Sequence, residues 1–355
     1  MSKSVYVVHH GQQHNDYLWE KEITEINSIN PDIVVCLCFE EYDVVYLFRN
    51  FFPKVSEWSV SNNKLVKVLV SNPNNVELFP NVVTESTFGF YYCMIGTVQH
   101  AIDNQLEVNP KLCDKVYTCY NNNPKFERAL LIEELSKRHL MQHGIVTFTR
   151  PAFVHNDNDG NKFPGWHYHN GDRLLDEIDF ELNACDEYTA NELPRSYMRG
   201  LIDLVSESNI RPTEFFTTEK TAKPIATLKP FICLANVDYH RFLTEEYGLE
   251  LYDELFDYSF DKEPNLNKRI SMIVDNIERI VEGYTDDFKH SMYETLLPKL
   301  LRNRQRFIDY GSRRDKIMID TIEHAVNNNY NIYGSDVGID ELTKVLGEYK
   351  RQNWL

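Results

Sequence analysis

Short apolar segments that alternate with helical ones are the feature that most constrains this chain. Four segments near its N-terminus are rich in Val, Ile and Tyr and are bounded by Asn, Pro or Gly: residues 4–10, 32–39, 44–48 and 65–71. Such runs are typical of buried strands, and residues 88–106 have apolar positions that suit a core helix. Strands that alternate with helices predict a parallel sheet with helices packed on it. We therefore expect a Rossmann-like N-terminal domain over residues 1–108.

A second alternating set predicts a second Rossmann-like domain over residues 109–285. Its helices show apolar faces: Leu130, Leu131, Leu135 and Leu140 recur at helical spacing within 127–141, and Ile270, Ile273, Val274, Ile277 and Ile280 do so within 265–284. Its strands are expected at 112–120, at 144–154, after a short helix within 195–208, and at 230–236. Residues 286–355 read as a mostly helical tail. This α/β organisation is similar to the GT-B architecture of glycosyltransferases, in which two Rossmann-like domains face a cleft that holds the ligands.

Composition excludes several classes of protein. A net charge of −17 argues against charge-driven binding to nucleic acid, although a local basic face remains open. The seven cysteines are odd in number and contain no CxxC pair, so neither a disulfide framework nor a zinc site is indicated. Because no apolar run approaches the ~20 residues of a membrane helix and no signal peptide is apparent, we expect a soluble, cytoplasmic protein without membrane insertion.

The segment TTEKTAKPIA, residues 217–226, carries the first candidate site. A helix that begins near residue 220 would present free N–H groups and a positive dipole end, which suit a diphosphate. Lys220 would add a charge for that phosphate, and Glu219 would accept hydrogen bonds from a ribose diol. Pro224 is expected in the first turn of this helix. The candidate nucleotide-binding residues here are Thr218, Glu219, Lys220, Thr221 and Lys223; the alternative is a solvated surface charge pair.

An arginine after an Asn-rich turn carries the second candidate site. In VYTCYNNNPKFERALLIEEL, a predicted strand leads through Asn122 to Arg128 in the first turn of a helix, where a guanidinium can meet a phosphate. This order, with TEK about ninety residues later, resembles the α-1,3-fucosyltransferases. In that family the Arg, Glu and Lys bind the nucleotide diphosphate sugar, which implies the same role for Arg128, Glu219 and Lys220. Tyr120 departs from the family, which has Ser there.

A closer likeness is to glycosyltransferase-like proteins of tailed phages and large DNA viruses. They share a segment similar to FFTTEKTAKPI with KPFI, followed by GLELYDELF and DYSFD. The likeness covers residues 112–285. It implies a DNA-modifying phage enzyme in the host cytoplasm as one version of the function. It gives no match in the N-terminal domain, so neither the acceptor nor the catalytic base carries over.

The loop HHGQQHND, residues 9–16, holds the candidates for that base. It follows the first predicted strand, and His14 or Asp16 would take a proton from an acceptor hydroxyl. Glycine at position 11 lets a backbone approach a ligand closely. A polar surface loop is the alternative. Glu85 is a further catalytic candidate.

Metal binding is not expected. His167 and His169 stand two residues apart without a third ligand, and Asp157 and Asp159 lie in an Asn/Asp/Gly segment that suits turn chemistry. The basic residues between 299 and 316 read as a solvated helix face or as a site for a polyanionic acceptor.

These observations predict a glycosyltransferase that moves a sugar from a nucleotide diphosphate sugar to an acceptor hydroxyl, with no cofactor or metal. One acceptor is 5-hydroxymethylcytosine in double-stranded phage DNA, receiving glucose or arabinose. The alternatives are a glycan or lipid acceptor, as in fucosyltransferases, and a non-catalytic nucleotide-binding viral protein.

Overall fold

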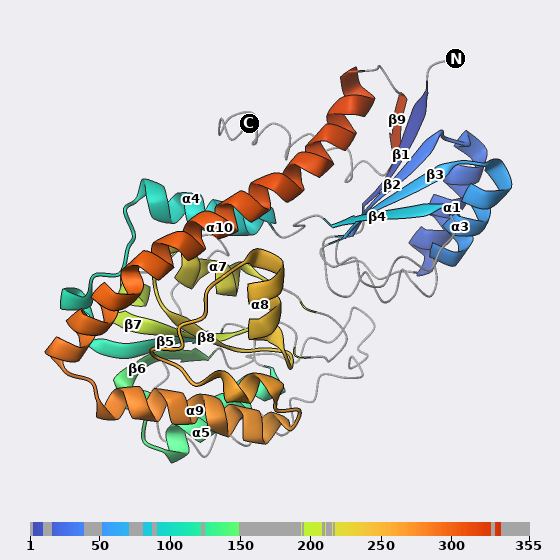
Figure 1. Ribbon diagram of the computed structural model, residues 1–355. Coiled ribbons are helices and arrows are strands. Elements are labelled where there is room, and N and C mark those ends of the chain that lie inside the picture. Colours follow the sequence, from blue (N-terminus) through green and yellow to red (C-terminus); the bar gives the residue numbers. More distant parts are fainter. Residues whose placement is uncertain are drawn as a thin grey trace. The chain divides into compact units, whose positions relative to one another are not determined.

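The structure is a computed structural model that describes residues 3–9, 16–38, 52–70, 81–86, 91–121, 125–148, 193, 195–207, 210, 215, 217–327 and 331–334. It is an α/β chain with two separate parallel sheets (Figure 1). The expected fold class is confirmed at this level, and the GT-B architecture stays a prediction. The chain divides into two compact units, Met1–Tyr92 with Ile308–Leu355, and Cys93–Phe307.

The first unit contains a five-stranded sheet in the order β4-β3-β2-β1-β9, with every pair parallel. Its elements are β1 (Ser4–His9), α1 (Asp16–Ile29), β2 (Ile33–Cys38), α3 (Phe52–Asn62), β3 (Leu65–Val70), β4 (Val82–Ser86) and β9 (Asn331–Gly334). The strands expected at 4–10, 32–39 and 65–71 are confirmed to within a residue or two at their ends. The strand expected at 44–48 lies outside the described residues.

Strand β9 is the main departure from the expected domain organisation. The C-terminal residues were expected to form a helical tail, yet β9 pairs with β1 at the edge of the first sheet. Glycine makes this approach feasible: Gly334 has φ +144°, and a Cβ there would lie 2.2 Å from the carbonyl oxygen of Val7. No local sequence pattern predicts a pairing between two strands this far apart in the chain.

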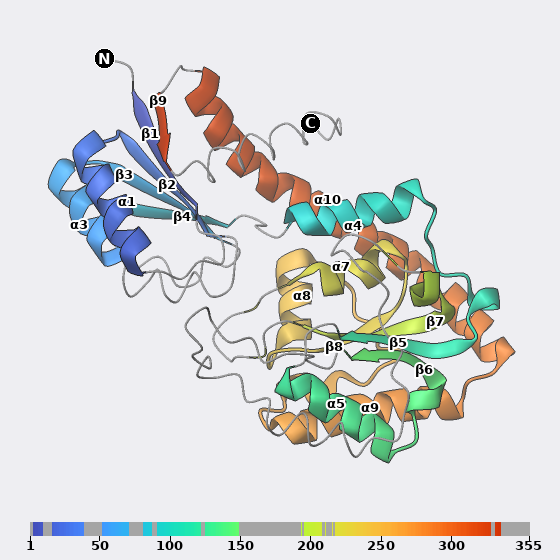
Figure 2. The ribbon, with the colours of Figure 1, turned by 180° about the vertical axis from the view of Figure 1, so that it is seen from behind.

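Buried rows of apolar side chains form the core of the first unit. Tyr6, Val34 and Val66 stand in register across β1, β2 and β3, and all three are fully buried. Helices α1 and α3 pack side by side next to this sheet (Figure 2), and Ile26 and Phe52 are their buried contributions. The adjacent residues of β1 and β2, such as Val7 and Val35, point to the opposite face and are also buried, so both faces of these strands are covered.

The second unit contains a four-stranded parallel sheet in the order β6-β5-β7-β8. Its strands are β5 (Lys115–Asn121), β6 (Gly144–Phe148), β7 (Gly200–Ser206) and β8 (Phe231–Leu234). Its α-helices are α4 (Tyr91–Asp103, beginning at the unit boundary), α5 (Phe126–Lys137), α7 (Glu219–Ala226), α8 (Tyr239–Tyr247), α9 (Leu266–Glu282) and the first part of α10 (Asp286–Asn327). Short 3-10 helices are η2 (Pro110–Leu112), η3 (Met141–His143), η4 (Arg195–Arg199) and η5 (Tyr258–Lys262).

Helices cover both faces of this second sheet. Helices α5 and α9 pack against each other on one face, and α7 and α8 lie on the other (Figure 1). The predicted apolar face of α9 is confirmed, because Ile270, Ile273, Val274, Ile277 and Ile280 are all buried. This arrangement leaves the strand ends, rather than the sheet faces, for binding.

The second unit begins earlier in the chain than the sequence suggested. The expected boundary was residue 108, whereas the compact unit starts at Cys93. Two bonds tie the residues after α4 to this unit: the Val108 N–H donates to the carbonyl oxygen of Thr227 at 2.9 Å, and Glu107 pairs with Arg304 at 2.8 Å. Tertiary contacts of this kind set a domain boundary without any change in composition.

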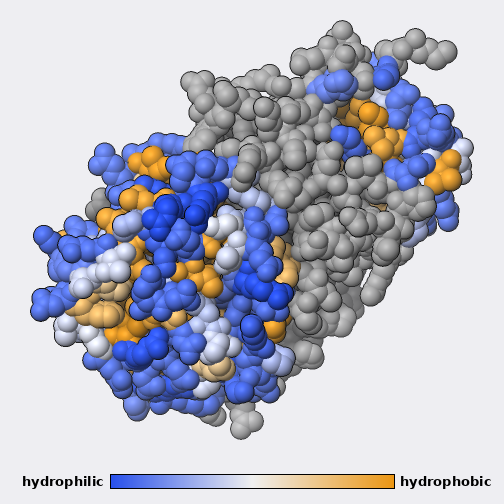
Figure 3. Space-filling model, viewed as in Figure 1, coloured by the Kyte–Doolittle hydropathy of each residue, from blue (hydrophilic) through white to orange (hydrophobic). Residues whose placement is uncertain are grey.

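The visible face of the second unit is mostly hydrophilic, with apolar residues between the polar ones (Figure 3). Exposed apolar side chains such as Leu112 and Leu301 are common on protein surfaces. Among the described residues, no helix has the length and apolarity that a bilayer crossing requires.

Candidate functional site

The direction in which successive strands are added to the second sheet reverses between β5 and β7. From β5 it steps outward to β6, then returns to the other side of β5 as β7 and continues to β8. The β5–β7 pairing ends at Thr118 and Asp203, although β5 pairs with β6 as far as Asn121, and β7 pairs with β8 as far as Ser206. Ligands of open α/β sheets bind outside the carboxyl ends of the strands at such a switch point. The candidate site is therefore the edge where β5 and β7 end.

Arg128 lies at this edge. It is in the first turn of α5, as predicted, and only 1% of it is exposed. Its Nη2 donates to the carbonyl oxygens of Ser206 at 3.3 Å and Glu207 at 3.4 Å, so its guanidinium joins α5 to the end of β7. Burial lowers the pKa of this guanidinium, and the carboxylates of Glu127, Glu207 and Glu219 oppose that shift. A guanidinium stays protonated under any such shift at neutral pH.

Two buried oxygens near Arg128 lack a hydrogen-bond partner among the described residues: Asn121 Oδ1 at the end of β5 and Ser206 Oγ at the end of β7. Asn121 is fully buried, and its amide nitrogen donates to the Cys119 sulfur at 3.1 Å. Buried polar atoms are nearly always satisfied by protein, water or ligand. The two oxygens therefore mark this strand edge as a place for a bound polar group.

Glu207 is the centre of the polar network at this edge. It directly follows β7 and is fully buried. Its carboxylate accepts from the Thr218 N–H at 3.2 Å, from the Thr218 hydroxyl at 2.7 Å and from the Thr221 hydroxyl at 2.5 Å. The Tyr239 hydroxyl of α8 adds a fourth contact at 3.3 Å. Glu207 thus ties the end of β7 to the first turn of α7 and to α8.

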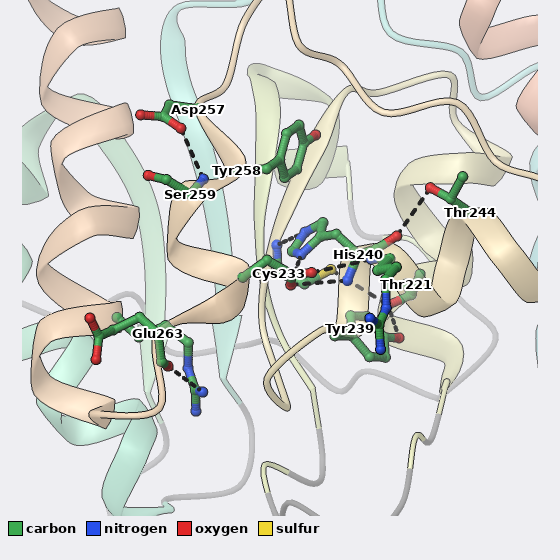
Figure 4. A network of polar contacts seen from close by, with 12 residues as sticks. Thr221, Cys233, Tyr239, His240, Thr244, Asp257, Tyr258, Ser259 and Glu263 are labelled. Atoms are coloured by element: carbon green, nitrogen blue, oxygen red, sulfur yellow. Dashed lines mark hydrogen bonds and ion pairs between the residues drawn. The ribbon is translucent and has the colours of Figure 1, made fainter.

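This network employs two residues that the sequence assigned to the nucleotide. Thr218 is the N-cap of α7, and its hydroxyl accepts from the Lys220 N–H at 3.2 Å while it donates to Glu207. Thr221 lies one turn later, close to Tyr239 (Figure 4). Burial and the Glu207 carboxylate raise the pKa of Tyr239 well above its usual range, so its hydroxyl remains a donor. Both threonines therefore stabilise the first turn of α7 from its buried side.

Glu219 and Lys220 are more accessible than the threonines. Their side chains are 15% and 22% exposed and form an ion pair of 2.6 Å. The Lys220 ammonium also lies 3.4 Å from the Thr218 hydroxyl. A chain of contacts therefore leads from Arg128 through Glu207 and Thr218 to Lys220, although about ninety residues separate its ends. The structure thus brings the two predicted motifs to the same sheet edge.

Two details of α7 differ from the sequence-based expectation. Pro224 was expected in the first turn, but α7 begins at Glu219, so the proline lies in the second turn. Its missing N–H leaves the carbonyl of Lys220 without the usual helical donor, and α7 ends two residues later. Lys223 is only 5% exposed, so it packs inside the unit.

The predicted catalytic residues belong to the first unit and are described only in part. His14 lies outside the described residues, as does Asn122 of the second unit. Asp16 is the first residue of α1, and Glu85 is in β4. The segment that carries His14 follows the carboxyl end of β1, which lies at the reversal point of the first sheet between β2 and β9. The fragments with His167, His169, Asp157 and Asp159 are also outside the described residues.

A histidine of α8 and a carboxylate of η5 stabilise the edge strand β8. His240 Nε2 accepts from the Cys233 N–H at 3.1 Å (Figure 4), and its Nδ1 lies 2.9 Å from Asp261. Asp261 also accepts from the His240 and Arg241 N–H groups at the start of α8. The pair satisfies an outward-facing backbone donor of β8, and it positions the helix that carries Tyr239.

Several side chains of the predicted basic run pair with acidic residues of the same unit. Lys299 binds Glu254 at 2.7 Å, Arg302 and Arg306 bind Glu250 at 2.8 Å each, and Arg304 binds Glu107. These ion pairs connect α10 to Glu107, Glu250 and Glu254, which precede it in the chain. Their charge is largely compensated within the protein, which weakens the case for this run as a DNA-binding surface.

Sequence reasoning missed Glu207 and Tyr239. A carboxylate directly after an apolar strand is the one local signal for Glu207, and many solvated loops share it. Of Tyr239, the sequence shows only an aromatic residue at the start of a short helix. No cluster of three or more His, Cys, Asp or Glu side chains in the described part of the chain has the arrangement of a metal site.

The chain matches no protein-family model, no curated protein and no solved structure. Any assignment therefore rests on the chemistry of the site itself.

Proposed function

We propose that this protein is a nucleotide-sugar-dependent glycosyltransferase of GT-B architecture whose donor binds to the second unit at the carboxyl edge of β5 and β7. The observation that carries the proposal is the convergence of Arg128 and Lys220 at that edge through Glu207 and Thr218. Two cationic side chains at a switch point suit a nucleoside diphosphate. Asn121 Oδ1 and Ser206 Oγ supply polar atoms beside it.

The roles follow from exposure and charge. Lys220 would exchange its ion pair with Glu219 for the diphosphate, which leaves the Glu219 carboxylate to accept from the ribose hydroxyls. Arg128 is buried, so it would act as a fixed positive charge beneath the donor rather than as a mobile clamp. Stabilising the leaving diphosphate is the main electrostatic task in such a transfer.

The reaction breaks the bond between the anomeric carbon and the diphosphate oxygen. The acceptor oxygen forms the new bond to that carbon, its proton passes to a base, and the nucleoside diphosphate leaves with the electron pair. We assign the base to the first unit, to His14, Asp16 or Glu85. His14 and Asp16 follow β1 in the sequence, and the carboxyl end of β1 lies at the reversal point of that sheet, whereas Glu85 is in β4. No metal or further cofactor enters this scheme.

Two classes of acceptor are compatible with this reaction. A hydroxymethylated cytosine in phage DNA is one, and a glycan or lipid hydroxyl is the other. The ion pairs of Arg302 and Arg304 favour the second class, because these side chains already bind carboxylates. Electrophoretic mobility shift with hydroxymethylated DNA separates the two: no shift at low salt argues against the DNA acceptor.

Thermal shift with UDP, GDP, CMP and their sugars tests the donor site. A nucleotide that binds only the folded state raises the melting temperature, by RT ln(1 + [L]/Kd) in free energy. We expect a rise with one nucleotide class, its loss in Lys220→Ala, and its retention in Lys111→Ala, which removes an exposed lysine of the same unit. No rise with any of these nucleotides would overturn the proposal.

Sugar transfer must then be shown separately from binding. Incubation of the protein with the nucleotide sugar that binds, followed by chromatography of the released nucleoside diphosphate, measures transfer to acceptor or to water. Binding without release would instead support the non-catalytic nucleotide-binding protein.

A further inference from the structure

A tyrosine hydroxyl bonded to two carboxylates lies inside the first unit. Tyr6 of β1 is fully buried, and its hydroxyl oxygen is 2.6 Å from Glu22 Oε2 and 2.6 Å from Glu25 Oε2, both on α1. Distances this short are those of strong O–H···O bonds to a charged group. The cluster links the first strand of the sheet to the helix that packs on it.

The number of protons in this cluster determines its state. A tyrosine hydroxyl carries one hydrogen, so it donates to only one carboxylate. If both glutamates were ionised, the second contact would bring a lone pair of the phenol oxygen against a negative oxygen at 2.6 Å. Two short contacts are therefore satisfied only when one of the two carboxyl groups is protonated and donates to the Tyr6 oxygen.

Exposure decides which carboxyl group holds that proton. Glu22 is 8% exposed, and burial raises its pKa. The side chain of Glu25 is 41% exposed and lies 3.7 Å from the Lys21 ammonium. Burial, together with the hydrogen bonds to Glu22 and Glu25, also raises the pKa of Tyr6 well above its usual range, so Tyr6 keeps its proton. Glu22 then donates to Tyr6, and Tyr6 donates to Glu25.

The surroundings of the cluster supply little compensating charge. The Cys36 thiol of β2 is buried on the same side of the sheet, and burial keeps its pKa high, so it stays neutral. Lys67 of β3 stands in register with Val35, whereas Tyr6 stands in register with Val34, so Lys67 belongs to the opposite face. The charged residues of α3 in the described part of the chain are exposed, namely Lys54 and Glu57, and Lys64 pairs with Asp32 at the amino end of the sheet.

We propose that Tyr6, Glu22 and Glu25 form a proton-binding clamp between β1 and α1, in which Glu22 holds the proton and α1 loosens from the sheet when that proton is lost. This inference does not depend on the proposed glycosyltransferase function. It concerns β1 and α1, the elements that precede and follow residues 10–15 in the sequence.

The sign of the pH dependence follows from the raised value for Glu22. A carboxyl group that binds its proton more tightly when folded adds stability below its unfolded pKa, and this stability is lost as pH rises through the folded pKa. Above about pH 4.5, the unfolding equilibrium constant therefore rises up to tenfold per pH unit because of this one group.

Infrared spectroscopy of the full chain in D2O tests the clamp directly. A protonated carboxyl group gives a C=O stretching band separate from those of carboxylates and amides. At neutral pD we expect this band in the wild type and in the matched control Glu20→Gln, which removes an exposed carboxylate of the same helix. We expect its loss in Glu22→Gln.

Urea unfolding between pH 5 and 8 supplies the second measurement. Relative to Glu22→Gln, the wild-type unfolding constant should grow up to tenfold per pH unit, whereas Glu20→Gln should show the wild-type dependence. The absence of the band in the wild type, its persistence in Glu22→Gln, or equal pH dependence in all variants would each overturn the proposal. The wild-type band decides the matter even if Glu22→Gln does not fold.

Discussion

Removal of the Glu207 side chain is the most informative perturbation of the second unit. The carboxylate accepts from four donors, of which three are hydroxyls and one is the backbone N–H of Thr218. In Glu207→Ala the Thr221 and Tyr239 hydroxyls, 3.1 Å apart, can still bond to each other. The Thr218 N–H cannot rotate toward a new partner, so it stays buried and unsatisfied.

The expected loss of stability is about 3 kcal/mol. An orphaned buried donor costs ~1–3 kcal/mol, and the lost bonds to a charged acceptor and the space left by the side chain add to it. For a unit of this size ~1 kcal/mol corresponds to ~2–4 °C, so the melting temperature should fall by roughly 6–12 °C. Glu207→Gln keeps the volume and one acceptor oxygen, and it should cost about 1–2 kcal/mol.

Urea unfolding followed by circular dichroism measures these changes. Glu245→Ala is the matched control, because this glutamate is 69% exposed and its carboxylate lies 3.8 Å from Arg241. An exposed ion pair of this kind contributes ~0–1 kcal/mol to the free energy of unfolding. If Glu207→Ala and Glu245→Ala differ by less than ~0.5 kcal/mol, Glu207 is not the centre of the network, and the link from β7 to α7 falls with it.

Two further predictions concern the same unit. Burial opposes ionisation of Asp261, but hydrogen bonds from His240 and from backbone N–H groups outweigh it and lower its pKa. Its stabilisation is therefore present above about pH 3.8 and lost as pH falls through the folded value; Asp261→Asn should flatten the acid unfolding curve in that range, and an unchanged curve would contradict this. Gly144→Ala should destabilise the unit by ~1–3 kcal/mol, because its Cβ would lie 2.4 Å from the Tyr117 ring. Gly283→Ala, whose nearest neighbour is 3.6 Å away, should be neutral or slightly stabilising in the same unfolding assay; equal effects at the two sites would refute the steric argument.

The polar network at the α7 edge changes how the TEK segment should be understood. The sequence suggested that the free N–H groups at the start of this helix bind a diphosphate. In the structure the Thr218 N–H already binds a carboxylate of the protein, and the Lys220 N–H binds the Thr218 hydroxyl. The side chains of Lys220 and Glu219 remain the accessible part of the segment, so the proposed donor contacts rest on them.

Local patterns in the sequence determined the type and place of most elements. The apolar runs of β1, β2, β3, β5 and β8 reflect the burial of strands inside parallel sheets, and the helical period of α9 reflects burial of one face of a helix. Both patterns are contained in neighbouring residues. The first turn of α5 with Arg128 was predicted for the same reason. The sequence also provided the two motifs that the function proposal joins.

Only the tertiary structure decided how distant segments combine. The pairing of β9 with β1, the reversal between β5 and β7, and the contact of Arg128 with Glu207 depend on residues far apart in the chain. Strand order and buried hydrogen bonds are set by the packing of whole elements, and no window of a few residues contains that information. A buried glutamate and a solvated one look alike in a sequence, because the difference between them lies in which donors the fold brings within 3 Å.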